Sequence, residues 1–178
     1  MIATSIPAMS SLDDYAALLG AAEIEELRTL AAPLEGSVVE MVNSTAVGGG
    51  VAEILTRMLP LMRGLGFDAR WHVMEGGPEF YEITKAFHNA LHGHSRPFQP
   101  RDFEIFLEYN QRTCRQLALD GRFVVIHDPQ PAALIESRAP AQSDGQKWFW
   151  RCHIDLSHAD LAVWRFLDRK STRLNSSH

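Results

Sequence analysis

The feature that most constrains the fold is an alternation of apolar, strand-like runs with amphipathic, helix-like stretches. The strand-like runs lie at residues 37–43, 67–74, 122–128 and 147–156. Helical periodicity fills the intervals between them and follows the last one, at residues 50–66, 78–93, 101–119, 131–137 and 159–167. Neighbouring parallel strands need long crossover connections, which helices usually supply. The alternation therefore predicts a Rossmann-like α/β domain, a parallel sheet with helices on both faces.

The alternating pattern occupies only part of the chain. Two short amphipathic helices are predicted at residues 11–19 and 22–34, so residues 1–36 form an amino-terminal helical segment. Residues 37–167 carry the alternation and are predicted to form one Rossmann-like lobe, which is incomplete. No linker inside this range is long enough to divide it further.

The last residues, 168–178, read DRKSTRLNSSH and lose both the apolar content and the period of the helix before them. Such a segment is typical of a disordered tail. We favour a second interpretation, because the peptide resembles a sequencing adapter translated in frame. In that case the natural sequence in hand ends near Leu167 and the chain is a fragment.

Charge and hydropathy argue against two classes of partner. The net charge is −5, and no stripe of lysine and arginine interleaves with aromatic residues, so we expect no nucleic-acid partner. No segment approaches the roughly 20 apolar residues that cross a bilayer, so we expect no membrane partner. The start of the chain lacks the order of a signal peptide, and we therefore expect a cytoplasmic protein.

Three consecutive glycines, Gly48, Gly49 and Gly50, separate the first predicted strand from its helix. Ligands of parallel α/β sheets bind where the carboxyl ends of the strands meet. Glycines there let the backbone take positive φ and approach a ligand, and the helix that follows offers free N–H groups. A flexible turn is the alternative, but one glycine would serve for that. We predict a pocket for a phosphate or a sugar hydroxyl, although the spacing matches neither a P-loop nor GxGxxG.

Polar pairs lie at the ends of the third and fourth predicted strands. His127 and Asp128 close the third strand, and His153 and Asp155 lie at the end of the fourth. A single histidine at such a place is more often a hydrogen-bonded structural residue than a catalytic one. Because glycine, His-Asp and His-x-Asp loops are predicted at the same edge of one sheet, we expect them to form one site.

The helix predicted at 78–93 carries Lys85, His88 and Asn89 within little more than one turn. These side chains could present donors together to a sugar or a phosphate, or they could form a solvated helix face; the spacing leaves both open. His88 and His92 are four residues apart, but no carboxylate or cysteine completes a set of ligands. We therefore expect no metal.

Four segments, in this order, resemble one family: VNSTAVGGGVAEIL, ARWHVMEGGPEFYEITKAFHNALHG, HDPQPAALI and WFWRCHIDLS. They are similar to the amino-terminal half of the trehalose glycosyltransferring synthases, retaining enzymes of glycosyltransferase family four. The likeness runs from about Val38 to Leu167. It implies a GT-B fold, in which two Rossmann-like lobes enclose the active site, and this chain would hold the amino-terminal lobe.

The resemblance also implies roles for the predicted site. The glycine loop, Gly48 to Gly50, would face the phosphates of the donor. His153 would lie near the donor sugar and Asp128 would hold acceptor hydroxyls, and these two are the expected catalytic residues. Further acceptor-binding candidates follow from their positions near the cleft: His127, Glu75, Lys85, His88, Asn89 and Asp155.

The implied reaction transfers glucose from a nucleoside diphosphate glucose to the anomeric hydroxyl of glucose, and α,α-trehalose forms with retention. No cofactor is expected. The partner implied inside the protein is a carboxy-terminal lobe that grips the nucleotide; without it we expect the chain to be inactive, and a homodimer is left open. A trehalose phosphorylase and a non-catalytic sugar-binding lobe are alternatives. The glycine spacing disfavours a nicotinamide oxidoreductase.

Overall fold

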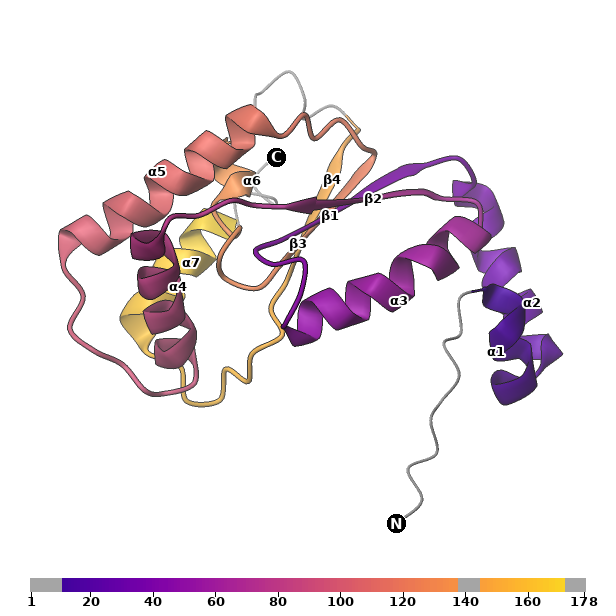
Figure 1. Cartoon of the computed structure of the whole chain (residues 1–178), viewed down its shortest axis with the longest axis horizontal. Coiled ribbons are helices and arrows are strands. Elements are labelled where there is room, and N and C mark those ends of the chain that lie inside the picture. The colour runs from indigo at the N-terminus through magenta and orange to yellow at the C-terminus, as the bar shows by residue number, and fades with distance from the viewer. Residues whose placement is uncertain (1–10, 138–144, 172–178) are drawn as a thin grey trace, which may run out of the picture.

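The computed structural model describes residues 11–137 and 145–171. Its centre is a four-stranded sheet in the order β2-β1-β3-β4 (Figure 1). The strands are β1 (Val38–Asn43), β2 (Asp68–Val73), β3 (Phe123–His127) and β4 (Lys147–Arg151). Every pairing in this sheet is parallel. The predicted Rossmann-like α/β architecture is therefore confirmed.

Helices fill each crossover between the strands and flank the sheet. In chain order they are α1 (Leu12–Leu19), α2 (Ala21–Ala31), the short 3₁₀ turn η1 (Ala32–Leu34), α3 (Gly50–Gly64), α4 (Pro78–Leu91), α5 (Pro100–Gln116), α6 (Leu134–Ser137) and α7 (Leu161–Ser171). The hydrophobic period places most of these elements within a few residues of their observed bounds. Pro78 at the first position of α4 marks the start of that helix correctly, and α5 begins one residue before its predicted start, at Pro100.

The fourth strand is shorter than the sequence predicts, because it ends at Arg151 rather than at residue 156. Its last rung is the bond from Asp128 N to Arg151 O, at 2.9 Å. Asp128 has a φ of 65°, in the left-handed region, so β3 turns away from its neighbour at this point. The next backbone donor, His153 N, bonds to the carboxylate of Asp128 instead, at 2.8 Å. The strand ends because its partner leaves.

Helices cover both faces of the sheet. On one face, Leu55 and Leu59 of α3 pack against Val39, Met41 and Ala69 of the first two strands. On the other face, apolar residues of β1, β3 and β4 pack against α6 and the segment after α5: Val42, Val124, Ile126, Trp148, Leu119, Leu134 and Ile135. Removal of these side chains from water stabilises the lobe by about 25 cal/mol per Å² of apolar surface.

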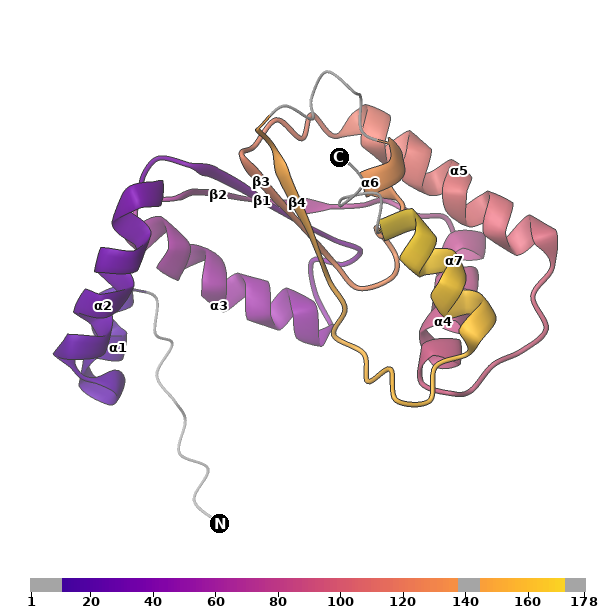
Figure 2. The same ribbon diagram turned by 180° about the vertical axis from the view of Figure 1, so that it is seen from behind.

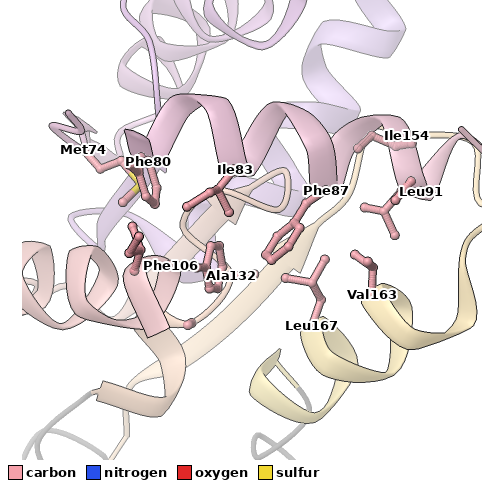
Figure 3. Packing of buried hydrophobic residues seen from close by; sticks show 13 residues of the cluster. Met74, Phe80, Ile83, Phe87, Leu91, Phe106, Ala132, Ile154, Val163 and Leu167 are labelled. Atoms are coloured by element: carbon pink, nitrogen blue, oxygen red, sulfur yellow. The ribbon is translucent and has the colours of Figure 1, made fainter. Parts of the chain in front are cut away.

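A third apolar cluster joins α4, α5 and α7 at the end of the molecule away from α1 and α2 (Figures 1 and 2). Phe80 and Phe87 of α4 are fully buried, and their ring centroids lie 6.3 and 5.3 Å from that of Phe106 in α5. Val163 and Leu167 of α7 lie across the cluster from α4 (Figure 3). The apolar face of α4 is thereby buried, and its polar face points away from the cluster.

The same cluster also anchors the loops that leave the sheet. Met74 follows β2, Ala132 follows β3 and Ile154 follows β4, and all three are buried in it. The loops at the carboxyl ends of these strands are therefore tied to α4 by apolar packing. This connection places the polar side chains of the loops relative to those of α4.

Helix α7 runs past the boundary that the sequence suggests at residue 168. It continues to Ser171, and Lys170 Nζ lies 2.7 Å from a carboxylate oxygen of Glu136. Residues 172–178 of the expected tail, and residues 1–10 of the amino-terminal segment, lie outside the described part of the chain. The adapter origin of the tail stays a prediction. Within the described ranges, no helix is both long and apolar enough to cross a bilayer.

Candidate functional site at the carboxyl edge of the sheet

Three loops that carry predicted site residues leave the same edge of the sheet. Val42 of β1 lies opposite Ile126 of β3, and His127 of β3 lies opposite Arg151 of β4, so the three strands end side by side. The glycine loop therefore starts next to the His127-Asp128 turn, which starts next to the segment with His153. The expectation that these loops share one edge is confirmed by the register.

The two histidines at this edge contact each other. Nδ1 of His127 lies 3.0 Å from Nε2 of His153, and the rings are stacked with centroids 5.3 Å apart. The side chain of His127 is only 1% exposed, and its Nε2 lies 3.5 Å from Sδ of Met41. Burial, then the ring of His153 and the charge of Arg151, lowers the pKa of His127 to about 4. His127 is therefore neutral at pH 7.

This burial bears on the role predicted for His127. Both of its ring nitrogens face protein atoms, so its side chain cannot reach an acceptor sugar directly. The sequence pattern identifies the residue as part of the site but not which way it points. His127 contacts His153 instead, whose ring is half-buried.

Asp128 organises the turn between β3 and the next segment. Its carboxylate oxygen Oδ1 accepts from His153 N, and its backbone oxygen accepts from Trp150 Nε1 at 2.9 Å. Its φ of 65° is the only positive value at a non-glycine residue in the described ranges. Aspartate tolerates this conformation better than most residues because its short polar side chain can bond locally. The two expected catalytic residues, Asp128 and His153, are thus in direct contact.

The glycine loop uses its three glycines in different ways. Gly48 has a φ of 75°, whereas Gly49 is extended and caps α3, and Gly50 is the first residue of that helix. A Cβ on Gly49 would lie 3.3 Å from Cγ2 of Thr45, which is a tight contact. Positive φ, predicted as an option for all three glycines, is therefore used at Gly48 alone.

Two polar residues that were not among the predicted site residues hold the glycine loop. The side-chain amide of Asn43 donates to Thr45 O at 2.7 Å, and Thr45 Oγ1 donates to Val47 O at 2.6 Å. Asn43 Oδ1 also accepts from Trp71 Nε1 at 2.8 Å, which ties the loop to β2. Asparagine and threonine just before a glycine run are the available signal, because both often bond to nearby backbone.

A surface groove of about 930 Å³ adjoins the glycine loop and runs along α3. Its lining includes Gly48, Gly50, Ile54 and Arg57. Arg57 lies about two helical turns from the start of α3, and Glu53, one turn before it, lines the same groove with the opposite charge. Arg57 was not among the predicted site residues, although its spacing of seven residues from Gly50 places both on one helix face.

Helix α4 presents a polar face toward this edge. Tyr81, Lys85, His88 and His92 recur at helical spacing, away from the buried face shown in Figure 3. Tyr81 Oη lies 3.3 Å from Ser44 O, so this face reaches the start of the glycine loop. The rings of His88 and His92 lie 4.8 Å apart. Lys85 and Asn89 are exposed. Their exposure agrees both with donors that bind a ligand and with a solvated helix face.

The loop after β4 closes the other end of this face. A Cβ on Gly93 would lie 3.1 Å from His158 O, and Asp160 N donates to Ala90 O at 2.9 Å, so the loop touches the end of α4. The carboxylate of Asp155 accepts from Ser157 Oγ at 2.6 Å and from Ser157 N at 3.0 Å. These bonds lower the pKa of Asp155, and the nearby histidines contribute.

The predicted residues thus form two groups around one edge. Asp128, His127 and His153 are in direct contact, and Asp155 lies near His92 at the end of the face that carries His88. Glu75 is exposed in the loop between β2 and α4. Among the described residues, no group of three or more histidine, cysteine, aspartate and glutamate side chains is arranged to hold a metal ion.

Comparison with known proteins assigns the lobe to a family. The family model described as "Trehalose synthase, N-terminal domain" matches residues 41–177, which is most of the chain. The chain belongs to the trehalose synthase family. The match contains the glycine loop, the His127-Asp128 turn, α4 and the loop after β4. The resemblance stated from the four sequence segments is therefore confirmed.

Curated members of the trehalose synthase family are similar over nearly the whole chain. The trehalose synthase of Thermococcus litoralis is 44% identical over 158 residues, which cover 88% of this chain and 37% of that protein. The trehalose synthase of Rubrobacter xylanophilus is 40% identical over 164 residues, or 90% of this chain and 39% of that protein. The chain thus spans less than two fifths of the length of these relatives.

A second kind of relative is more distant. The trehalose phosphorylase of Pleurotus pulmonarius is 30% identical over 91 residues, which cover 50% of this chain and 12% of that protein. The similarity is both weaker and shorter than that to the trehalose synthases.

Proposed function

We propose that this chain is the amino-terminal lobe of a GT-B, retaining glucosyltransferase, which forms α,α-trehalose from a nucleoside diphosphate glucose and glucose. Membership of the trehalose synthase family supports the product. The single observation that carries the proposed mechanism is the contact of Asp128 with His153 beside the glycine loop. A carboxylate, an imidazole and a glycine-rich helix start on one sheet edge suit the binding of a sugar phosphate.

Transfer with retention makes two physical demands on such a site. The departing diphosphate must be stabilised, and the acceptor hydroxyl must be held close to the anomeric carbon on the same face of the sugar. Backbone N–H groups of Gly48 to Gly50 and the start of α3 would meet part of the first demand. Arg57 of the same helix would add a cation, although Glu53 in the first turn of α3 offsets part of its charge. The missing carboxy-terminal lobe would supply the rest of the charge and bind the nucleotide.

The second demand falls on the residues around the edge. Asp128 would hold acceptor hydroxyls while it fixes the backbone of His153. Glu75, Lys85, His88, Asn89 and Asp155 would add acceptor contacts from α4 and the loops around it. His153 would lie beside the donor sugar and stabilise the oxocarbenium-like transition state through the sugar hydroxyls, without a proton-transfer role. No cofactor takes part in this scheme.

A trehalose phosphorylase is the second candidate, and the relative in Pleurotus pulmonarius supports it. Such an enzyme passes the glucosyl group between phosphate and glucose. The same lobe could serve either reaction, because the groups that distinguish a nucleotide from a phosphate would lie in the other lobe. A sugar-binding lobe without catalysis remains a third reading.

The test is product analysis with the complete gene product, read past the codon for Leu167 in source DNA. We expect trehalose from glucose with a nucleoside diphosphate glucose and none from glucose with glucose 1-phosphate. The opposite result supports the phosphorylase. Replacement of His153→Ala should abolish turnover, whereas His94→Ala, at an exposed histidine in the loop after α4, should not. Full activity in the His153 variant would refute the role of His153.

A further inference from the structure

His127 and His153 form a hydrogen-bonded pair whose proton positions follow from their surroundings. Nδ1 of His127 lies 3.0 Å from Nε2 of His153, and Nε2 of His127 lies 3.5 Å from Sδ of Met41. In a neutral imidazole one nitrogen carries the proton and the other accepts. The neighbours of the two nitrogens of His127 therefore decide which histidine donates to the other.

The thioether of Met41 decides the tautomer of His127. A thioether sulfur is a weak acceptor and has no proton to donate. If Nε2 of His127 were unprotonated, its lone pair would face the sulfur without any donor, at a side chain that is 1% exposed and out of reach of water. A proton on Nε2 instead makes an N–H···S contact. Nδ1 of His127 is then the acceptor.

The tautomer of His153 follows from that of His127. Nε2 of His153 must donate, because Nδ1 of His127 offers only a lone pair. In a neutral His153 the remaining acceptor is Nδ1, which makes no hydrogen bond to any residue in the described ranges. The ring is half-buried, and the backbone of His153 is held by Asp128 at 2.8 Å. The residue is thus fixed at its backbone and at its inner ring nitrogen.

The surroundings of the pair keep the ring of His127 neutral. Burial, the ring of His153 and the guanidinium of Arg151 on the neighbouring strand lower the pKa of His127 to about 4. Asp128 engages the backbone of His153, with Oδ1 bonded to its N–H. At neutral pH His127 therefore holds one proton, and a doubly protonated ring does not compete.

We propose that His127 is a positioning residue that holds His153 in the Nε2–H tautomer, so that Nδ1 of His153 accepts a hydrogen bond from a hydroxyl of the transferred glucose. The tautomer is inferred from contacts within this lobe, whereas the hydrogen bond to the sugar rests on the proposed function. A hydroxyl that shares its proton with an acceptor donates more electron density to the sugar ring. That effect strengthens as positive charge develops in the transition state.

The tautomers can be measured directly by long-range proton–nitrogen correlation NMR of the chain with labelled histidines, above neutral pH. The signals of His127 are assigned through their loss in His127→Asn. We expect a protonated Nε2 and an unprotonated Nδ1 in both His127 and His153. A protonated Nδ1 in His127 overturns the proposal.

A second variant tests the cause of this preference. Met41→Leu keeps the volume of the buried side chain and removes the sulfur. We expect the preference of His127 for the proton on Nε2 to weaken in this variant. An unchanged preference would show that the sulfur of Met41 does not set the tautomer of His127, and it would overturn the proposal.

Kinetics of the complete protein test the consequence for catalysis. His127→Phe keeps an aromatic ring without an acceptor, and we expect kcat to fall about tenfold or more while the KM values change less. His127→Asn can place its amide oxygen where Nδ1 lies, so it should recover part of the loss. Equal losses in both variants, or a loss confined to KM, overturn the positioning role. If the complete protein forms no trehalose with any donor, the proposed function fails, and the NMR result still decides the tautomer.

Discussion

His127, the last residue of β3, and Asp128, which follows it, have different structural roles in this lobe. His127 points into the protein, with its ring between Met41 and His153, while Asp128 turns the chain in a left-handed conformation and binds the backbone of His153. Alternation of side chains along β3 places His127 on the same face as Phe123 and Val125, next to Met41 of β1. The left-handed conformation of Asp128 then turns the chain away from β4, and its carboxylate accepts from the backbone N–H of His153 just after the end of β4.

The lowered pKa of His127 predicts a pH dependence of folding. The pKa falls from its usual 6.5 to about 4 in the folded chain, so the unfolded chain binds more protons between these values. The contribution of neutral His127 to the free energy of unfolding is therefore fully present above pH 6.5 and is lost as the pH falls toward 4. We expect this residue to account for about 3 kcal/mol of the decrease in the free energy of unfolding between pH 7 and pH 4.

Urea unfolding of the chain and of His127→Asn across this pH range measures the effect. The variant lacks the group that titrates, so its free energy of unfolding should decline less steeply as the pH falls. Parallel pH profiles for the two proteins would contradict the prediction. Other titrating groups are common to both and cancel in the comparison.

Substitutions of Asp128 separate its backbone role from its hydrogen bond. Asp128→Gly removes the bond to His153 N but accepts a positive φ, whereas Asp128→Ala loses the bond and also strains the backbone. We expect the alanine variant to be less stable than the glycine variant by about 1 kcal/mol, and both to be less stable than the parent. Denaturant unfolding checks the order. An alanine variant as stable as the glycine variant would mean that φ of 65° costs nothing here.

At the scale of elements, the link between β1 and α3 shows where glycine is required. Gly48 needs a positive φ, while Gly50 is an ordinary first residue of a helix, and an added Cβ at either position meets no atom within 4 Å. The loop is further held by Asn43 and Thr45. Its shape is therefore set by one backbone conformation and a few side-chain bonds.

These differences predict that alanine lowers the free energy of unfolding at position 48 but not at position 50. Gly48→Ala should lower the free energy of unfolding by about 1 kcal/mol, because alanine is strained at positive φ. Gly50→Ala, the matched control, should leave stability unchanged or raise it by about 0.5 kcal/mol, because it reduces the freedom of the unfolded chain. Thermal and denaturant unfolding measure both. Equal effects would indicate that the loop relaxes around Gly48.

The elements themselves were largely predictable, and the exceptions have identifiable causes. Hydrophobic periodicity located all four strands and the helices between them, since burial of one face leaves a period in the sequence. The predicted end of the fourth strand at residue 156 was wrong, because WFWRCHIDL is apolar enough to continue although the neighbouring strand turns away at Asp128 and β4 ends at Arg151. A property of a distant segment thus decided a local boundary.

Considered as a whole, the described part of the chain forms one lobe, and its candidate site lies at the carboxyl edge of the sheet. The chain spans 37% of the trehalose synthase of Thermococcus litoralis, and its candidate site opens from the carboxyl ends of the strands. Under the proposed function, groups that bind the nucleotide are supplied by the remainder of the protein. The lobe alone then has the acceptor side of a site and only part of the donor side.

We therefore predict that the 178-residue chain forms no trehalose from a nucleoside diphosphate glucose and glucose. The physical reason is that backbone N–H groups at one helix start cannot replace a second set of cationic groups around a diphosphate. Chromatography of the products, with the complete gene product as the positive control, checks this. Steady formation of trehalose by the chain alone would contradict the prediction.

The α/β architecture, the family and the sheet edge at which the polar residues gather could all be predicted from the amino-acid sequence. Each follows from local information: apolar period, glycine and proline positions, and motifs that directly follow strands. Three contacts could be seen only in the folded chain: His127 with Met41, Asp128 with the backbone of His153, and Tyr81 with Ser44. These contacts join segments far apart in the chain, and they depend on strand register and on the packing of α4 against α5 and α7, which no local pattern encodes.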